Sequence, residues 1–165
     1  MKSITKLPLL ALLVVSVLTS CSTDSMDDTA ESIELNLVAI EAKDIEIEIL
    51  NLINDYRLTS GLNTLSDMSV VKSVAYSHTD YMVDNNEVSH DNFFTRSNYL
   101  KTNVGATKVS ENVAYGYSTA QTVVNAWLKS DGHRGTIEGD FTSFDVSAEK
   151  SENGRWYFTN IFIKK

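Results

Sequence analysis

The chain has 165 residues, a formal net charge of −8 and a single cysteine. One cysteine can form neither an intrachain disulfide nor a thiolate zinc cluster, so the fold must be held together by its core. The acidic balance provides no basic surface of the kind that binds nucleic acid, and we expect no nucleic-acid partner.

The N-terminus has the features of an export signal. Two lysines precede an apolar run over residues 7–18, which has signal-peptide length and is too short to span a bilayer comfortably. The residues Leu-Thr-Ser-Cys at 18–21 resemble a bacterial lipobox, which implies cleavage before Cys21 and acylation of that residue. Residues 1–20 are therefore predicted to be a lipoprotein signal peptide, with Cys21 anchoring the chain to the membrane. An ordinary secretory signal with an incidental cysteine is the alternative.

An acidic segment separates this signal from the rest of the chain. Between Ser22 and Glu48 nine acidic residues stand against Lys43 alone. Such a stretch is predicted to stay extended and solvated, so residues 21–48 are interpreted as a lipidated cysteine followed by an acidic tether. Residues 49–165 are long enough for one domain with a real core. The expected location is extracytoplasmic and membrane-anchored, at the outer membrane or the cell surface.

Three helices are predicted in the first half of this domain. Apolar residues recur at helical spacing from Ile45 to Tyr56, and Gly61 is placed to end that helix. Ser66 or Asp67 can cap a second helix, which ends at Asn85-Asn86. A third, shorter helix is expected over residues 96–101. The second helix carries its apolar face on five residues: Val71, Val74, Ala75, His78 and Met82.

The second half changes from helix to strand. Ser118 with Gln121 three residues on forms a capping-box pattern that predicts a fourth helix. Apolar residues then alternate over residues 144–148, Asn153-Gly154 is typical of a hairpin turn, and residues 156–163 read as a second strand. Helices followed by a hairpin predict an α+β fold with helices packed on a small antiparallel sheet.

Three polar blocks do not follow any core-facing period: residues 89–90, 111–116 and 127–134. Their order, spacing and flanking residues resemble the bacterial SCP-like branch of the CAP superfamily, which comprises cysteine-rich secretory, antigen 5 and pathogenesis-related proteins. The resemblance runs from Ile49 to Phe162. It implies an α-β-α sandwich in which the two histidine-bearing segments converge on one cleft.

The resemblance also assigns candidate site residues. His90, Glu111 and His133 match the family's two histidines and the glutamate of its Gly-Glu-Asn motif, although Ser110 replaces the glycine. Ser130 stands where the family usually has a second glutamate. Many bacterial members share this serine. The family's Ile-Gly-Val-Gly-x-Ala sequence is also altered here, to Phe-Asp-Val-Ser-Ala over residues 144–148.

Three kinds of chemistry are open to this cleft. His90 and His133 could bind Zn²⁺ or another divalent ion weakly, with Glu111 as the third ligand that a tight site would need. A histidine beside Glu111, or Glu111 itself, could act as a general base. The cleft could instead bind a polar ligand by hydrogen bonds. A fourth possibility is a purely structural polar network.

The neighbouring polar residues have less specific interpretations. Ser130, Arg134 and Asn112 are candidate ligand-binding residues. Arg134 can equally pair with an acidic neighbour such as Glu138 or Asp140, and Asn112 is expected to bond to backbone. His78, on an apolar helix face, is predicted to be a core histidine.

Two hydrolase signatures are excluded. The stretch around Ser118 resembles a nucleophile elbow, but its final glycine is missing and His133 follows too soon for another strand. No His-Glu-x-x-His motif is present, so a zincin is excluded. The leading hypothesis is a binding protein for an envelope or extracellular peptide, glycan or lipid. The alternative is a hydrolase of peptide, ester or cell-wall bonds that uses Glu111 and a histidine, with or without a metal.

Overall fold

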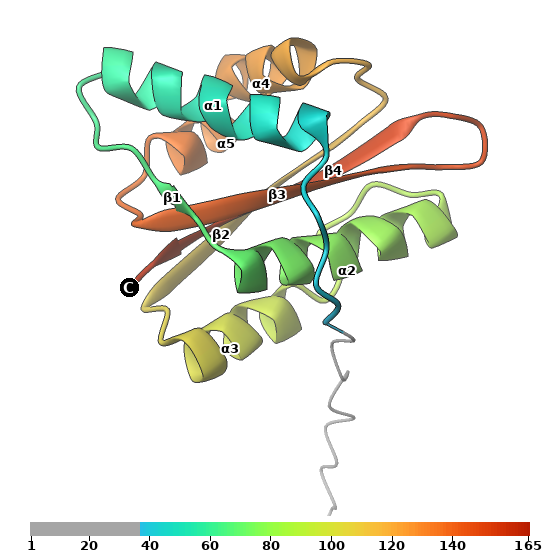
Figure 1. Ribbon diagram of the computed structural model, residues 1–165, viewed down its shortest axis with the longest axis horizontal. Helices are drawn as coiled ribbons and strands as arrows, with labels where there is room; N and C mark the ends of the chain where they lie inside the picture. The colour runs from blue at the N-terminus through green and yellow to red at the C-terminus, as the bar shows by residue number, and fades with distance from the viewer. Residues whose placement is uncertain (1–36) are drawn as a thin grey trace, which may run out of the picture. The chain divides into compact units, whose positions relative to one another are not determined.

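The computed structural model describes residues 37–165, and these form three layers around one sheet (Figure 1). The signal peptide, Cys21 and the first part of the tether lie outside the described residues. Five helices are present in the described part: α1 (Asp44–Thr59), α2 (Ser69–Asn85), α3 (Phe93–Val104), α4 (Ala120–Lys129) and α5 (Asp131–Ile137). Its four strands are β1 (Ser66–Asp67), β2 (Lys108–Tyr115), β3 (Ser143–Lys150) and β4 (Trp156–Lys164). None of these helices is long and apolar enough to cross a membrane.

The sheet has the strand order β1-β3-β4-β2, so β2 and the very short β1 are its edges. The three long strands are antiparallel, and β2 is aligned so that Glu111 lies opposite Ile161 and Asn112 opposite Asn160 of β4. The two-residue β1 pairs with β3 in parallel, so the small, mainly antiparallel sheet is mixed. The predicted α+β class and the helix-sheet-helix sandwich are confirmed.

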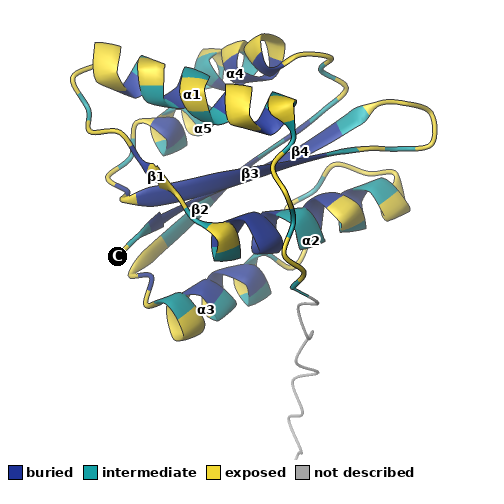
Figure 2. Ribbon diagram, in the orientation of Figure 1, coloured by how far each residue is buried: buried dark blue, intermediate teal, exposed yellow. Residues whose placement is uncertain are grey.

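Helices cover both faces of the sheet, so the central strand β4 is buried along nearly its whole length (Figure 2). On one face α1, α4 and α5 pack through a core that includes Ile53, Trp127 and Phe158. On the other face α2 and α3 pack through a core that includes Val74 and Ile161. Burial on both faces explains why β4 is apolar on both sides of the central pair Thr159-Asn160 instead of alternating along its length.

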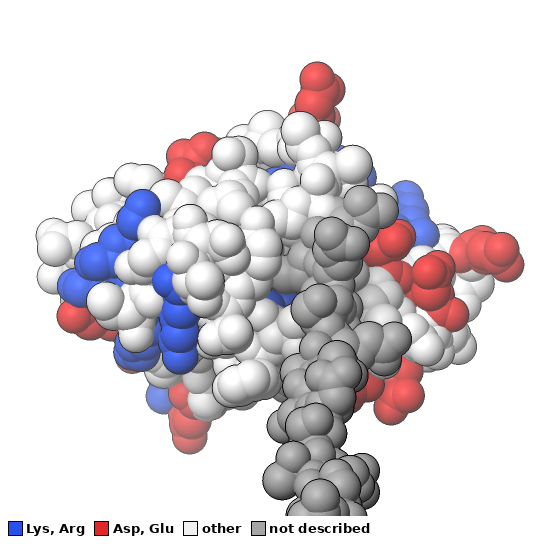
Figure 3. Space-filling view, turned by 90° about the horizontal axis from the view of Figure 1, so that it is seen from below, with Lys and Arg blue, Asp and Glu red and all other residues white. Residues whose placement is uncertain are grey.

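The surface that carries α2 and α3 has an uneven charge distribution. Figure 3 shows lysine and arginine side chains gathered toward one end of this face and acidic side chains toward the other. The face is therefore not uniformly basic.

The folded domain begins earlier than residue 49. Helix α1 starts at Asp44, and Glu46 is fully buried. The Glu46 carboxylate accepts the Ala148 backbone amide at 2.8 Å and pairs with Lys72, which donates to the Val146 carbonyl at 2.9 Å. These side chains take the place of a strand neighbour along β3 beyond the end of β1. Residues 44–48 thus belong to the domain rather than to the tether, because Glu46 accepts a backbone amide of β3 that has no neighbouring strand on its side within the described residues.

Helix boundaries depart from the sequence prediction in three places. The N-cap of α4 is Thr119 rather than Ser118, and its hydroxyl accepts the Thr122 amide at 3.2 Å. Met68 precedes α2, because Ser66 and Asp67 are used in β1. Helix α3 extends over 93–104, beyond the predicted 96–101. In each case a neighbouring element or an extra turn decides the end, which local propensity alone does not fix.

Candidate functional site

The site is built around one carboxylate, that of Glu111 on the edge strand β2. The register with Ile161 directs Glu111 toward the α2 and α3 side of the sheet, where its side chain is buried. Arg96 of α3 donates from Nε to Oε2 at 2.9 Å and from Nη2 to Oε1 at 2.8 Å. Arg96 is itself buried and also donates to the Asp91 carbonyl. A two-pronged guanidinium contact of this kind is the strongest form of charge-assisted hydrogen bonding in proteins.

His90, in the loop between α2 and α3, contacts the same carboxylate from outside. Its Nδ1 lies 2.9 Å from Glu111 Oε1, while 54% of its side chain remains exposed. Because a carboxylate accepts, Nδ1 carries the hydrogen, and Nε2 has no hydrogen-bond partner within the described residues. His90 is therefore the part of this cluster that a ligand can reach.

His78 of α2 is the buried histidine of this cluster. It is buried, its Nε2 donates to the Ser89 carbonyl at 2.8 Å, and the same nitrogen lies 3.9 Å from Glu111 Oε1. The predicted core position of His78 is confirmed. The sequence did not indicate, however, that this histidine would lie beside Glu111.

The electrostatics of the cluster follow from this packing. Burial alone would raise the pKa of Glu111, but the hydrogen bonds from His90 and Arg96 and the Arg96 charge more than offset it, so that pKa lies below its ordinary value. Burial lowers the pKa of His78, against the attraction of Glu111. At neutral pH the cluster thus contains an ionised Glu111, a charged Arg96 and a neutral His78. A carboxylate held in this state is a poor proton acceptor.

His133 lies on the other side of the same edge strand, in helix α5. Asn112, the residue after Glu111, points to this opposite face and donates from Nδ2 to the His133 carbonyl at 3.0 Å. Burial, and to a lesser extent the proximity of His90, lower the pKa of His133, so its ring is neutral at neutral pH. The expectation that Asn112 bonds to backbone is confirmed, and this contact places His133 against β2.

The outer edge of β2 runs between the two histidines. Trp127 of α4 donates from Nε1 to the Val113 carbonyl at 3.1 Å, which shows that the backbone groups of Val113 point away from β4. In an antiparallel pair these groups alternate, so those of Val109 and Glu111 point the same way. Within the described residues neither of these two has a hydrogen-bond partner along that edge.

A shallow cavity opens at this edge. It has a volume of about 260 Å³ and is lined by His90, Phe93, Val109, Ser110 and Glu111. One imidazole, one aromatic ring and the strand edge thus share a surface. It suits a polar ligand with a small apolar group.

Ser130 and Arg134 lie near His133 but are engaged in local structure. Ser130 ends α4 and precedes α5, and its carbonyl accepts the Arg134 amide at 2.8 Å. The Arg134 guanidinium donates to Asp131 at 2.7 Å and lies 3.9 Å from Glu138. The expected pairing with Glu138 is present, whereas Asp140 pairs with Lys164 instead. Contact of Ser130 and Arg134 with a ligand stays a prediction.

The residues present do not fit a tight metal site. Within residues 37–165 no three His, Cys, Asp or Glu side chains are grouped so as to hold an ion. Glu111, the expected third ligand, already has both oxygens bound to Arg96. His90 and His133 would offer only two nitrogens, fewer than catalytic zinc sites use.

Comparison with known proteins places this geometry in a family. The family model described as "Cysteine-rich secretory protein family", CAP, matches residues 50–162. The chain belongs to this family. The CAP domain of this chain is 32% identical over 124 residues to the "Uncharacterized membrane protein YlbC" of Bacillus subtilis (strain 168), covering 73% of this chain. The chain spans about a third, 34%, of the length of that relative.

Solved structures agree with the assignment. An outer surface protein from Borrelia burgdorferi superposes with a TM-score of 0.68 at 22% identity, covering 78% of this chain and 98% of that one. An extracellular protein containing an SCP domain, from Bacillus anthracis, gives 0.63 at 28% identity, covering 73% of this chain and 40% of that one. The predicted membership in the bacterial SCP-like branch of the CAP superfamily is confirmed.

The positions of Arg96 and His78 beside Glu111 were not predicted from the sequence. The signal that could have found Arg96 is charge balance, because a buried glutamate needs a cation and only Arg96, Lys101 and Lys108 stand between His90 and Glu111. His78 carried no such signal. Its place on an apolar face is equally typical of an ordinary core histidine.

Proposed function

We propose that this chain is a lipid-anchored, extracytoplasmic binding protein whose CAP domain presents the cleft between His90 and His133 to an envelope or extracellular ligand. The lipobox-like sequence ending at Cys21 and the acidic tether support anchoring with the domain held away from the membrane. The names of two relatives, a membrane protein and an extracellular protein, support the same side of the membrane. An outer-membrane or cell-surface position remains part of this proposal.

One observation carries the choice of binding over hydrolysis. The Glu111 carboxylate is buried, ionised and bound through both oxygens by Arg96. A general base needs a pKa near the working pH, whereas the pKa of Glu111 is lowered, and Arg96 and His90 already occupy three of its acceptor positions. The carboxylate instead orients His90, whose outer nitrogen is left for a ligand.

Among peptide, glycan and lipid, the edge of β2 favours an extended peptide. Exposed backbone groups of an edge strand pair with the backbone of an added strand, and neighbouring pockets then select its side chains. The outward groups of Val109 and Glu111 would supply the pairing, and the cavity beside Phe93 would take a side chain. His90 and His133, one on each side of the edge, would contact the peptide from both faces.

The test uses peptides selected from a random display library on the full chain in non-ionic detergent. Binding of a selected peptide is measured by fluorescence anisotropy for the parent, His90→Ala and His133→Ala. Each variant loses one hydrogen bond worth about 1–1.5 kcal/mol, so affinity should fall roughly tenfold. Amide hydrogen exchange at Val109 and Glu111 should slow when the peptide binds, because those amides become paired.

Glu48→Ala is the matched control, since Glu48 is exposed on α1, away from β2. Its affinity should equal that of the parent. A panel of peptide, ester and peptidoglycan substrates is run in parallel. Turnover that disappears in His133→Ala would contradict a purely binding role, and unchanged exchange at Val109 and Glu111 would exclude strand addition.

A further inference from the structure

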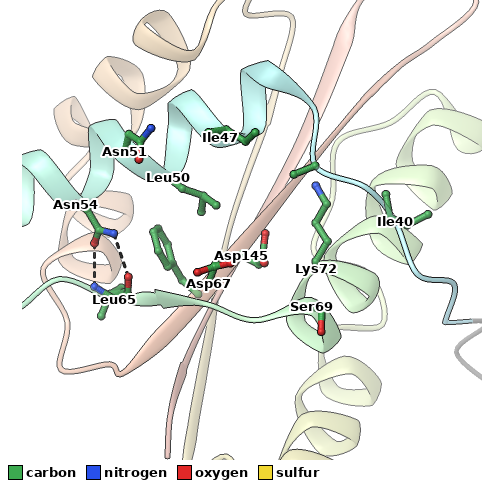
Figure 4. Close-up of a pocket in the computed structure, with 12 residues that line it drawn as sticks. Ile40, Ile47, Leu50, Asn51, Asn54, Leu65, Asp67, Ser69, Lys72 and Asp145 are labelled. Atoms are coloured by element: carbon green, nitrogen blue, oxygen red, sulfur yellow. Dashed lines mark hydrogen bonds between the residues drawn. The ribbon is translucent and has the colours of Figure 1, made fainter.

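A second cavity lies at the opposite edge of the sheet from the histidines, where β1 ends. It has a volume of about 440 Å³ and lies between α1, β1, α2, β3 and the segment before α1 (Figure 4). Ile40, Leu50 and Phe144 give it apolar walls. Small-molecule sites in proteins have volumes of this order, with apolar walls and a few polar groups.

A buried carboxylate, that of Asp145, lines this cavity. Asp145 is only 6% exposed, and its oxygens accept the Val146 amide at 2.9 Å and the Met68 amide at 3.2 Å. No ion pair to Asp145 is formed within the described residues. Burial raises the pKa of Asp145 to about 6, so at neutral pH the group is an ionised carboxylate that accepts two backbone amides and has the charge of Lys72 nearby. A carboxylate has room for further donors beyond these two.

Among the described residues, the one lysine that lines the same cavity, Lys72, already has an ion-pair partner. Lys72 pairs with Glu46 and donates to the Val146 carbonyl, so its charge is matched from α1. Asp67, at the exposed end of β1, adds a second carboxylate to the lining. The cavity therefore has an excess of negative charge against apolar walls.

We propose that this cavity binds a small organic ammonium ion, a primary amine on a short aliphatic chain. The ammonium donates to Asp145, and the chain lies against Ile40, Leu50 and Phe144. A carboxylate ligand is disfavoured because Lys72 is already paired. A bare metal ion is disfavoured by the apolar walls, since hard cations need several oxygen ligands.

The probe is n-butylammonium, titrated into the full chain in non-ionic detergent at neutral pH and followed by calorimetry. Butan-1-ol has the same chain without the charge, and butyrate carries the opposite charge. The ammonium should bind saturably, and both other probes at least tenfold more weakly. Equal binding of butan-1-ol, or no saturable binding of the ammonium, would overturn the proposal.

Two variants localise the site. Asp145→Asn keeps the shape and removes the charge, so affinity for n-butylammonium should fall at least tenfold. Asp140→Asn, which removes an exposed carboxylate paired with Lys164, is the matched control and should leave it unchanged. Ile40→Trp, on the segment before α1, fills the cavity without touching Asp145 and should also abolish binding. Retained affinity in both Asp145→Asn and Ile40→Trp would place the ammonium elsewhere and refute the assignment.

Discussion

Removing either partner of the buried ion pair between Glu111 and Arg96 should destabilise the CAP domain more than removing a partner of an exposed pair. Both side chains are buried, and the guanidinium binds both carboxylate oxygens. Removing one partner of such a pair leaves the other charge buried and unmatched, which destabilises a protein by about 3–5 kcal/mol. Glu111→Gln keeps the size and an acceptor for His90. Only the buried charge of Arg96 is left unmatched, so this variant should lower the free energy of unfolding by about 3 kcal/mol.

A double-mutant cycle separates the pair from its surroundings. Arg96→Met also removes the contact with the Asp91 carbonyl, so it should destabilise at least as much as Glu111→Gln. The double variant has no unmatched charge, so its loss should be smaller than the sum of the single losses by about 2 kcal/mol or more. The measurement is urea denaturation of the four proteins at neutral pH.

The exposed pair of Arg134 and Asp131 supplies the control. It joins the same kinds of charged group at 2.7 Å, but the side chain of Asp131 is 93% exposed, so Asp131→Asn should change stability little. Additive losses in the cycle, or single losses no larger than that of Asp131→Asn, would refute the assignment of Glu111 as a buried structural carboxylate. The general-base alternative would then regain support.

Two further predictions concern stability. Burial raises the pKa of Asp145 from 3.8 to about 6. The folded state therefore binds the carboxyl proton of Asp145 more tightly than the unfolded state does. The contribution of Asp145 to stability falls by about 3 kcal/mol as pH rises from about 4 to above 6. Urea unfolding at the two ends of this pH range should show that Asp145→Asn removes that loss. An equal loss of stability in the variant and the parent would contradict this prediction. A Cβ at Gly139 would lie 2.4 Å from Phe141 Cε2, so thermal unfolding should show Gly139→Ala destabilised by about 1–3 kcal/mol. Gly132→Ala, in α5 with nothing within 4 Å, is its control and should be at least as stable as the parent.

The candidate site was predictable in part because its outer residues lie in polar blocks. His90 and His133 interrupt the core-facing pattern, and the order of the blocks is typical of the CAP family. The structure brings His90 to Glu111 at 2.9 Å, whereas His133 contacts Asn112 through its carbonyl and does not line the cavity beside His90. The role of Glu111 was not predictable, because the sequence motif does not show whether the glutamate carboxylate is free or bound to an arginine.

The sequence by itself determined the class of fold, the family and most of the helices, because apolar periodicity and short polar motifs are local properties of a chain. Only the tertiary structure decided which charges are buried together. Arg96 joins Glu111, and Lys72 joins Glu46, through the packing of helices against the sheet, over separations that no local pattern encodes. The same packing made β2 an edge strand, with its free side between His90 and His133. Burial and partner choice are properties of the assembled layers, and the chemistry of this cleft depends on both.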